Sequence, residues 1–479
     1  MELARCEVPL TSATMIPAVS TGPADGIHCA YGRHDGGRER GFPTDTPRAC
    51  GMNVQRIRLS GVAVLLLLAA AGTVRADGLI RDGLGAISEG RGGTNIGFAD
   101  NGAILYDNPG ALVNVAGNGL ADIDVDTVIP QVHYTDTKPN NVNSAVRPIP
   151  TPELAYIRRS RDRQWAWGVG AFAPAGFGAS YQFQNSFAGP QKYQSLDGLG
   201  KCLAGLCYRV TDRLSIGGNL GFGINYLDLQ GPLYLQNGVL AGAPTIVNLQ
   251  NTGVAPTGGF GIQYLLSPKT TIGLNYISET RFKMGGNMDA MAFGLTPFPI
   301  YTKFAATTDL VWPRSLGVGF AHRFNSRNVL AIDTIWYDWS NAFNQVNVNL
   351  TNPTNPMVGA VAGQANVQRL PLNWRDTVSL RVGYQWMPDG VNIFRCGYVY
   401  HASPVPSGTI TPYTDGIMTN TFSLGYSRKI GRAYLNAAYQ YMFGPTRSVG
   451  VSSLAGGDFS NSTLRAQAHV ASLGILVPF

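Results

Sequence analysis

Residues 214–226 read LSIGGNLGFGINY and alternate between two kinds of side chain. One parity holds Leu214, Ile216, Leu220, Phe222, Ile224 and Tyr226, and the other holds Ser215, Asn219 and Asn225 with three glycines. Successive side chains of a β-strand point to opposite faces, so this stretch predicts a strand with one apolar face and one small, polar face. Soluble sandwiches also alternate in this way, so the pattern alone does not choose between a protein core and lipid.

The alternation recurs along the chain, and the lengths of the loops indicate whether the apolar face meets a protein core or lipid. We expect fourteen strands, at roughly 119–135, 150–160, 164–182, 198–210, 213–228, 252–267, 270–285, 304–324, 328–345, 373–387, 390–403, 419–429, 433–444 and 465–479. Many connections are short and rich in turn residues, whereas those at 229–251, 346–372 and 445–464 are long. Short turns on one side and long loops on the other are typical of a bacterial outer-membrane barrel, which also pairs every backbone group. The expected fold is therefore all-β: a 14-stranded antiparallel transmembrane β-barrel.

Composition agrees with this class. The chain has 479 residues, of which 44% are hydrophobic and 14% are charged, with 59 Gly, 21 Tyr and 20 Phe. Soluble domains average ~25% charged residues, so this weakly charged, Gly- and aromatic-rich chain is typical of a β-rich protein. Its basic residues are spread along the sequence and form no cluster interleaved with aromatic residues, which argues against a nucleic-acid partner.

The N-terminal region predicts secretion. Residues 52–76 start at Met52, carry Arg56 and Arg58, and continue into an apolar run at 61–71 that is shorter than the ~20 residues of a spanning helix. With small residues up to Ala76, this predicts a signal peptide at 52–76 rather than a buried core helix. Residues 1–51 are then an over-called start or a disordered extension.

The C-terminus fits the same reading. Leu473, Ile475 and Val477 alternate up to the terminal Phe479. A last strand of this form resembles the signal that the barrel-assembly machinery recognises, so we expect that machinery as a partner during biogenesis and outer-membrane lipid as the surroundings.

Residues 77–118 precede the first expected strand and contain Asp100-Asn-Gly-Ala-Ile-Leu-Tyr-Asp-Asn-Pro-Gly-Ala-Leu112. This segment resembles the N-terminal hatch of the FadL-type transporters, outer-membrane proteins for long-chain fatty acids and, in some branches, aromatic hydrocarbons. The family's hatch carries Asn-Pro-Ala, and here Asn108 and Pro109 are followed by Gly110 and Ala111. Three later stretches look similar as well: Trp312-Pro-Arg-Ser-Leu-Gly, Tyr337-Asp-Trp-Ser340 and Phe394-Arg-Cys-Gly-Tyr398. The resemblance covers residues 77–479. It implies a hatch at 77–118 inside a barrel at 119–479.

The third expected strand is broken by Pro174, Gly176 and Gly178. Proline donates no hydrogen bond to a ladder, and glycine weakens a strand interior. The resemblance implies that this strand bends inward and forms a lateral opening, through which a hydrophobic substrate leaves into the membrane. A plain bulge that sets barrel curvature is the alternative.

Apolar residues in the expected outer loops favour a greasy ligand. They include Leu233, Leu235 and Leu240 in 229–251, and Met288, Met291, Phe293 and Phe298 in 286–303. Exposed apolar patches mark binding sites, and in the family such loops first capture substrate. A lid of loops that pack on each other is the alternative.

A fatty-acid carboxylate needs a cation, and Arg281, Arg375 and Arg381 have lumen parity. We expect no cofactor, no metal site and no enzyme activity, because the histidines are isolated and no nucleotide-binding loop occurs. The expected function is passive uptake of long-chain fatty acids across the outer membrane of a Gram-negative bacterium, by a monomer with both mature termini in the periplasm. Alternatives are a transporter for aromatic or alkane hydrocarbons, a general porin for polar solutes and an outer-membrane lipase.

Overall fold

A computed structural model describes residues 79–138, 140–414 and 416–479. The predicted extension at 1–51 and signal peptide at 52–76 lie outside the described residues, as do Asp77 and Gly78 of the predicted hatch.

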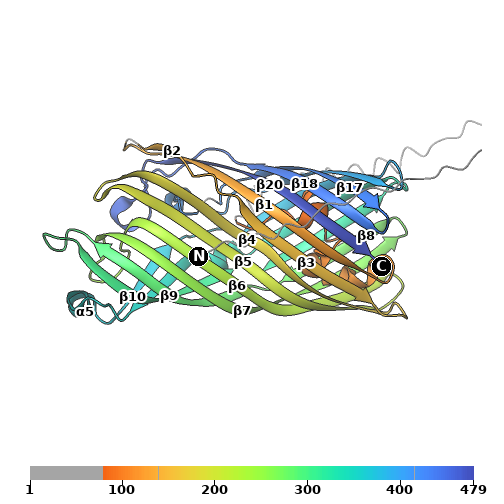
Figure 1. The fold of residues 1–479 in the computed structure, drawn as a ribbon, viewed down its shortest axis with the longest axis horizontal. Helices are drawn as coiled ribbons and strands as arrows, with labels where there is room; N and C mark the ends of the chain where they lie inside the picture. Colours follow the sequence, from red (N-terminus) through yellow and green to blue (C-terminus); the bar gives the residue numbers. More distant parts are fainter. Residues whose placement is uncertain (1–78, 139, 415) are drawn as a thin grey trace, which may run out of the picture. The chain divides into compact units, whose positions relative to one another are not determined.

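The wall consists of fourteen antiparallel strands, as predicted, and the first pairs with the last, which closes the barrel (Figure 1). In order around the wall they are β1 (Gly119–Thr135), β3 (Ile149–Arg159), β4 (Trp165–Asn185), β5 (Gly189–Arg209), β6 (Leu214–Tyr234), β7 (Pro244–Ser267), β8 with β9 (Thr270–Ile277, Thr280–Ala292), β10 with β11 (Ile300–Trp312, Ser315–Arg323), β12 with β13 (Asn328–Tyr337, Gln345–Thr351), β14 with β15 (Ala365–Pro371, Thr377–Trp386), β16 (Asn392–Tyr400), β17 (Asn420–Ile430), β18 (Ala433–Phe443) and β20 (Thr463–Pro478). Four of these wall strands are each made of two consecutive segments. The break in one of them holds α4 (Trp339–Ala342).

Short strands and helices lie in the long connections at one end of the barrel, here called the long-loop end. β2 (Asn141–Asn143) pairs with β1, β19 (Arg447–Ser448) pairs with β20, and α5 (Pro356–Ala362) lies between β13 and β14. Two single 3₁₀ turns, η2 (Ser407–Thr409) and η3 (Ala455–Gly457), complete the loops. None of the helices in the described residues combines the length and apolar character that crossing a membrane requires.

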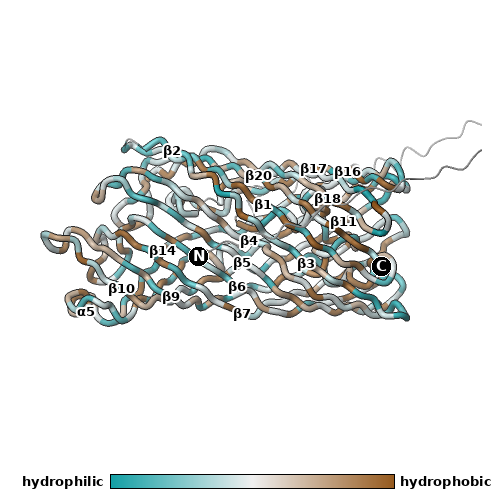
Figure 2. Tube along the Cα trace, viewed as in Figure 1, coloured by the Kyte–Doolittle hydropathy of each residue, from teal (hydrophilic) through white to brown (hydrophobic). Residues whose placement is uncertain are grey.

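The outer face carries an apolar belt on the half of the wall nearest the short turns. Apolar and polar residues alternate along the strands (Figure 2). The exposed apolar set includes Ile123, Val125, Leu220, Phe222, Leu316, Val318, Leu424, Leu473 and Ile475. Leu220 is 76% exposed and Leu473 is 69% exposed, so these side chains have no protein core to enter. Such a belt fits the hydrocarbon layer of a membrane, while the strands continue beyond it toward the long loops.

Residues 79–118, here called the hatch, fill the barrel near the short turns. They form α2 (Gly85–Glu89), α3 (Ile104–Asp107) and the 3₁₀ helix η1 (Pro109–Asn114). Carboxylates of the wall accept hatch backbone N–H groups: Asp122 from Gly102 at 2.7 Å, and Asp333 from Asn95 at 2.7 Å. Buried backbone donors need such partners, so these wall carboxylates fix the path of the hatch.

Glycines of the wall let the hatch approach closely. A Cβ on Gly383 of β15 would lie 2.4 Å from the carbonyl oxygen of Arg91, and one on Gly397 of β16 would lie 2.3 Å from the nitrogen of Gly92. Both distances are shorter than any real contact. The inner face of the wall is therefore shaped to the hatch backbone itself.

We predict that Gly383→Val loosens the hatch by about 1–3 kcal/mol through overpacking, while the barrel stays folded. Limited trypsin digestion should cut at Arg81 or Arg91 several times faster than in the parent protein, and heat-modifiable gel mobility should report an intact barrel. Gly285→Val on β9 is the matched control, because a Cβ there meets no atom within 4 Å. Equal protease resistance in both variants would contradict this account of the hatch.

Candidate functional site

The third wall strand, β4, contains a bulge at Ala173 and Pro174. Phe172 pairs with Lys201 of β5, but the next pair is Ala175 with Leu199, so two residues of β4 oppose one residue of β5. Before the bulge Ala166 and Phe172 are buried inside, and after it Ala175 and Phe183 are. Because of the extra residue, the even-numbered side chains of β4 point inward before the bulge, whereas the odd-numbered ones point inward after it.

The wall is open on the other side of this bulge. β3 and β4 pair from Arg159 with Ala166 up to Leu154 with Ala171, and the described residues show no pairing between them beyond that point. Residues 149–153 of β3 keep their ladder with β1 alone. Pro150 and Pro152 remove two backbone donors from this stretch. We call the space between residues 149–153 and 172–179 the β3–β4 gap.

The beginning of the hatch occupies part of the free edge of β4. The N–H of Arg81 donates to the carbonyl of Pro174 at 3.0 Å, and the N–H of Gly176 donates to the carbonyl of Leu79 at 3.1 Å. Residues 79–81 therefore act as a short extra strand where β3 has left the ladder. This pairing satisfies backbone groups that lipid could not satisfy.

The Arg81 side chain spans the β3–β4 gap. Its guanidinium donates to Thr151 Oγ1 at 3.2 Å and to Glu153 Oε1 at 2.7 Å on β3, and to the carbonyl of Ala173 at 3.2 Å on β4. It also forms ion pairs with Glu89 of the hatch and Asp126 of β1. Three buried carboxylates thus share one cation that holds both sides of the gap.

A cavity of about 370 Å³ lies at the gap. Its lining is mostly apolar and comes from both faces of the wall. Leu199 and Val470 line it from the inner face, whereas Gly178, Leu196 and Tyr226 line it from the outer face, with Tyr226 40% exposed. The cavity therefore leads from the barrel interior to the outer surface at the height of the apolar belt.

The predicted opening residues all belong to this region. Gly176 and Gly178 line the cavity, and the carbonyl of Pro174 holds Arg81. A Cβ on Gly178 would lie 3.2 Å from Ile149 of β3 and 3.3 Å from Leu196 of β5. A side chain at Gly178 would therefore fill the space between Ile149 and Leu196.

A second cavity of about 140 Å³ lies inside the barrel toward the long loops, and leucines dominate its lining. Leu233, Leu235 and Met288 of the predicted capture set line it. The carboxyl of Asp458 sits at its edge, and burial raises the pKa of Asp458 to about 7.

The predicted long loop at 229–251 is wrong in its bounds. β6 continues to Tyr234 and β7 starts at Pro244, so Leu233 lies on a strand. Met288 and Met291 likewise lie on β9. The barrel extends beyond the membrane, where its outer face is polar, and the strand ends therefore look like loops in the sequence. Of the remaining predicted residues, Leu240 and Phe293 are half-buried and Phe298 is 80% exposed.

Two of the three predicted lumen arginines lie elsewhere. Arg281 points to the exposed face and pairs with Glu279 at 2.8 Å, because the inner face of β9 is taken by the buried Phe282 and Met284. Arg375 is exposed in the break between β14 and β15. The lumen parity expected for both is therefore wrong. β9 turns apolar residues inward at this point, and Arg375 lies outside the strands beside the buried Trp374.

Arg381 does lie inside, as expected, but it is already engaged. It donates to Tyr337 Oη at 3.2 Å and lies 3.6 Å from Asp82 of the hatch. Burial opposes ionisation of Asp82, but His401 and Arg381 outweigh it and hold the pKa of Asp82 at about 2. Arg381 thus serves the hatch contact.

The sequence analysis missed Lys201. It lies on the inner face of β5, two positions from Leu199, and is 4% exposed. Its ammonium lies 5.5 Å from the ring centroid of Tyr106, and among the described residues it has no hydrogen bond or ion pair. Its neighbours Gly200 and Cys202 define no apolar or polar face, so alternation could not single it out. A buried cation without a counter-ion is costly, which makes Lys201 a candidate ligand for an anion.

The Asn108 motif holds the hatch to the wall. Asn108 caps η1 by accepting from the N–H of Gly110 at 3.1 Å, and its amide donates to Ile262 of β7 at 3.1 Å. Pro109 is the first residue of η1, and Ala111 is fully buried. A Cβ on Gly110 would lie 2.6 Å from the backbone of Gly261, so glycine here allows close contact with β7.

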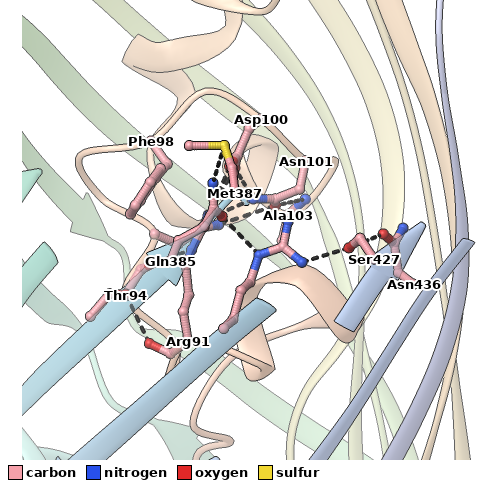
Figure 3. Close-up of polar contacts among 12 residues, drawn as sticks. Arg91, Thr94, Phe98, Asp100, Asn101, Ala103, Gln385, Met387, Ser427 and Asn436 are labelled. Atoms are coloured by element: carbon pink, nitrogen blue, oxygen red, sulfur yellow. Dashed lines mark hydrogen bonds and ion pairs between the residues drawn. The ribbon is translucent and has the colours of Figure 1, made fainter. Parts of the chain in front are cut away.

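A second polar cluster lies where the hatch meets the opposite wall (Figure 3). Arg91 binds Asp100 through two hydrogen bonds of 2.7 and 2.8 Å within the hatch. Beside them, Arg395 of β16 donates to Gln385 of β15 at 2.8 Å and to Ser427 of β17 at 2.5 Å. The attraction between Asp100 of the hatch and Arg395 of β16 then holds the hatch on the side away from the gap.

Comparison with known proteins gives the family. The family described as "Outer membrane protein transport protein (OMPP1/FadL/TodX)" matches residues 67–479. No curated protein sequence matches the chain.

Solved structures share the fold at low identity. A Pseudomonas aeruginosa FadL homologue is 16% identical with a TM-score of 0.67, covering 84% of this chain and 99% of its own. The Pseudomonas putida toluene transporter TodX is 19% identical with a TM-score of 0.70, covering 83% and 99%. The Ralstonia pickettii toluene transporter TbuX is 20% identical with a TM-score of 0.65, covering 82% and 98%. The chain is a member of the FadL/TodX family of outer-membrane transport proteins, which are transporters rather than enzymes.

Proposed function

We propose that this protein carries long-chain fatty acids passively across the outer membrane and releases them sideways through the β3–β4 gap. The observation that carries the proposal is the cavity of about 370 Å³ whose lining comes from both faces of the wall. A hydrophobic molecule that leaves there does not enter water, which avoids a transfer free energy of about 0.8 kcal/mol for each CH₂ group.

The proposed route starts at the long-loop end. Substrate first enters the leucine-lined cavity of about 140 Å³ there. It then moves along the lumen to the hatch and reaches the larger cavity. Residues 79–81 pair with β4 at this point, so part of the hatch must shift before substrate can leave. The filled lumen and the apolar cavities argue against a fixed pore for polar solutes.

Two features support a fatty acid in particular. An apolar cavity of about 150 Å³ is large enough for benzene, so the cavity at the gap suits a longer molecule. Lys201 directly follows Leu199 and Gly200, which line that cavity, and it is a buried cation that pairs with no carboxylate of the described residues. A substrate carboxylate would remove this cost.

Monoaromatic hydrocarbons are the second candidate. Two similar structures, TodX and TbuX, are toluene transporters by name, and the TM-score to TodX is 0.70. A neutral substrate would use the same apolar cavities and would leave Lys201 without a role.

Biogenesis and orientation follow from the same proposal. We infer that residues 52–76 act as the signal peptide and that the short turns and both mature termini face the periplasm. Phe479 stacks on Tyr156 at a centroid distance of 5.5 Å, and its carbonyl accepts from the N–H of Gly119 at 3.1 Å. These contacts suit a last strand that closes the barrel during assembly.

The first prediction from this proposal concerns the substrate. Bacterial cells without their own outer-membrane fatty-acid transporter should take up labelled oleate several times faster when they display this protein. Labelled toluene measured at matched surface levels separates the two candidates. Faster uptake of toluene alone would replace the fatty-acid assignment with the hydrocarbon one, and no gain for either would reject both.

The second prediction concerns the exit. Gly178→Leu should reduce uptake by about tenfold, because the new side chain fills the passage between Ile149 and Leu196 while those flexible side chains adjust without unfolding the wall. Gly285→Leu is the control, since its Cβ meets no atom within 4 Å. Unchanged uptake in a folded Gly178→Leu barrel would rule out this exit.

The third prediction concerns Lys201. Hydrogen bonds to charged groups contribute about 1.5–3 kcal/mol, so Lys201→Met should weaken fatty-acid binding by about tenfold or more. Binding of the matching fatty alcohol should change little, as should fatty-acid binding to the exposed control Arg281→Met. Equal loss for acid and alcohol would show that Lys201 does not hold the carboxylate.

A further inference from the structure

The barrel gathers basic residues that are spread along the sequence. Residues 79–479 contain 28 Lys or Arg and 22 Asp or Glu. The six short turns with their flanking residues (158–164, 209–213, 267–269, 323–327, 387–391, 428–432) hold twelve of the basic residues and three of the acidic ones. Outside these turns acidic residues are in slight excess. The rim of the barrel formed by these turns therefore carries the whole excess of basic over acidic residues in 79–479.

Two of these turns flank the place where the wall closes. Around the barrel the order is β17, β18, β20, β1, β3 and β4, so the two turns lie on either side of the strands β20 and β1. The β3–β4 turn exposes Arg158, Arg161 and Arg163, and the β17–β18 turn exposes Arg428, Lys429 and Arg432. None of these six side chains forms an ion pair within the described residues. Their charge is thus available to a partner.

Aromatic side chains lie next to this basic rim on the outer face. Trp165 packs on Tyr208 at 4.4 Å, Tyr156 on Trp167 at 5.6 Å, and Trp386 on Phe394 at 5.5 Å, as centroid distances. Trp165, Trp167 and Trp386 are each close to 45% exposed although they are large and apolar. Tryptophan and tyrosine mark the depth at which hydrocarbon meets lipid headgroups. Arg158, Arg163 and Arg428 each lie two residues from such an aromatic, namely Tyr156, Trp165 and Tyr426, on the side toward the turn. This spacing places the turn cations near the depth of the lipid phosphates.

We propose that the basic rim binds the headgroups of anionic phospholipids in the membrane leaflet that faces the short turns. Each exposed cation meets a phosphate or the net negative charge of a lipid such as phosphatidylglycerol, and the aromatic side chains pack beside its glycerol backbone. The opposite end, with its mixed charges, makes no such selection. The interaction anchors the barrel from one side and enriches anionic lipid around the rim.

The test is native mass spectrometry of the purified barrel titrated with phosphatidylglycerol, phosphatidylethanolamine or lipid A. We expect phosphatidylglycerol to bind several times more tightly than phosphatidylethanolamine, and salt to weaken it. A variant with Arg158, Arg161, Arg163, Arg428, Lys429 and Arg432 all changed to Gln should lose about tenfold in apparent affinity for phosphatidylglycerol, because each removed charge weakens attraction to the anionic surface.

The control variant changes six exposed cations outside the rim, Arg147, Arg281, Lys283, Lys303, Arg369 and Arg375, to Gln. It should bind phosphatidylglycerol like the parent. An equal loss of affinity for phosphatidylglycerol in both variants would show that binding depends only on the net charge. That result would overturn the rim as a binding site. Stronger binding of lipid A, lost in the rim variant, would overturn the assignment to phospholipid. Heat-modifiable mobility confirms that each variant is folded.

Discussion

Every backbone donor and acceptor in a lipid-facing wall needs a partner inside the protein, and the β3–β4 gap departs from that constraint at one height of the wall. The bulge at Ala173 and Pro174 ends the ladder with β3, and Pro150 and Pro152 remove donors from the other side. Residues 79–81 then supply the bonds that β3 does not, to Pro174 and Gly176. The hatch is therefore part of the wall at this point as well as a plug behind it.

This dual role explains why the hatch is tied so firmly to the rest of the interior. Asp122, Asp124 and Asp333 hold its backbone N–H groups, and Asn108 and Arg91 organise its middle. Glycines of the wall admit its backbone at contact distance. A plug that was held loosely could not also present a strand edge to β4 in a fixed register.

The sequence predicted the parts of the molecule that repeat. Alternation and turn residues were enough for the number of strands, and Pro174, Gly176 and Gly178 marked the part of β4 where the ladder is interrupted. The ends of β6, β7 and β9 were wrong because the outer face becomes polar where the wall leaves the membrane, which hides the alternation. The cations needed three-dimensional information. Arg281 is exposed because Phe282 and Met284 occupy the inner face, and Lys201 sits in a Gly-rich stretch whose faces cannot be told apart.

The charges around Arg81 limit how the gap can open. Glu89, Asp126 and Glu153 are buried, and Arg81 is the cation that all three contact. Removing one partner from a buried ion pair costs about 3–5 kcal/mol, so withdrawing Arg81 from three carboxylates together would be strongly opposed. Leu79 and Ile80 have no such tie, since they hold β4 through backbone bonds and apolar contact alone. An opening motion that moves residues 79 and 80 away from Gly176 while Arg81 keeps its carboxylates is therefore the least costly one, and it frees the part of the cavity that Gly178 lines.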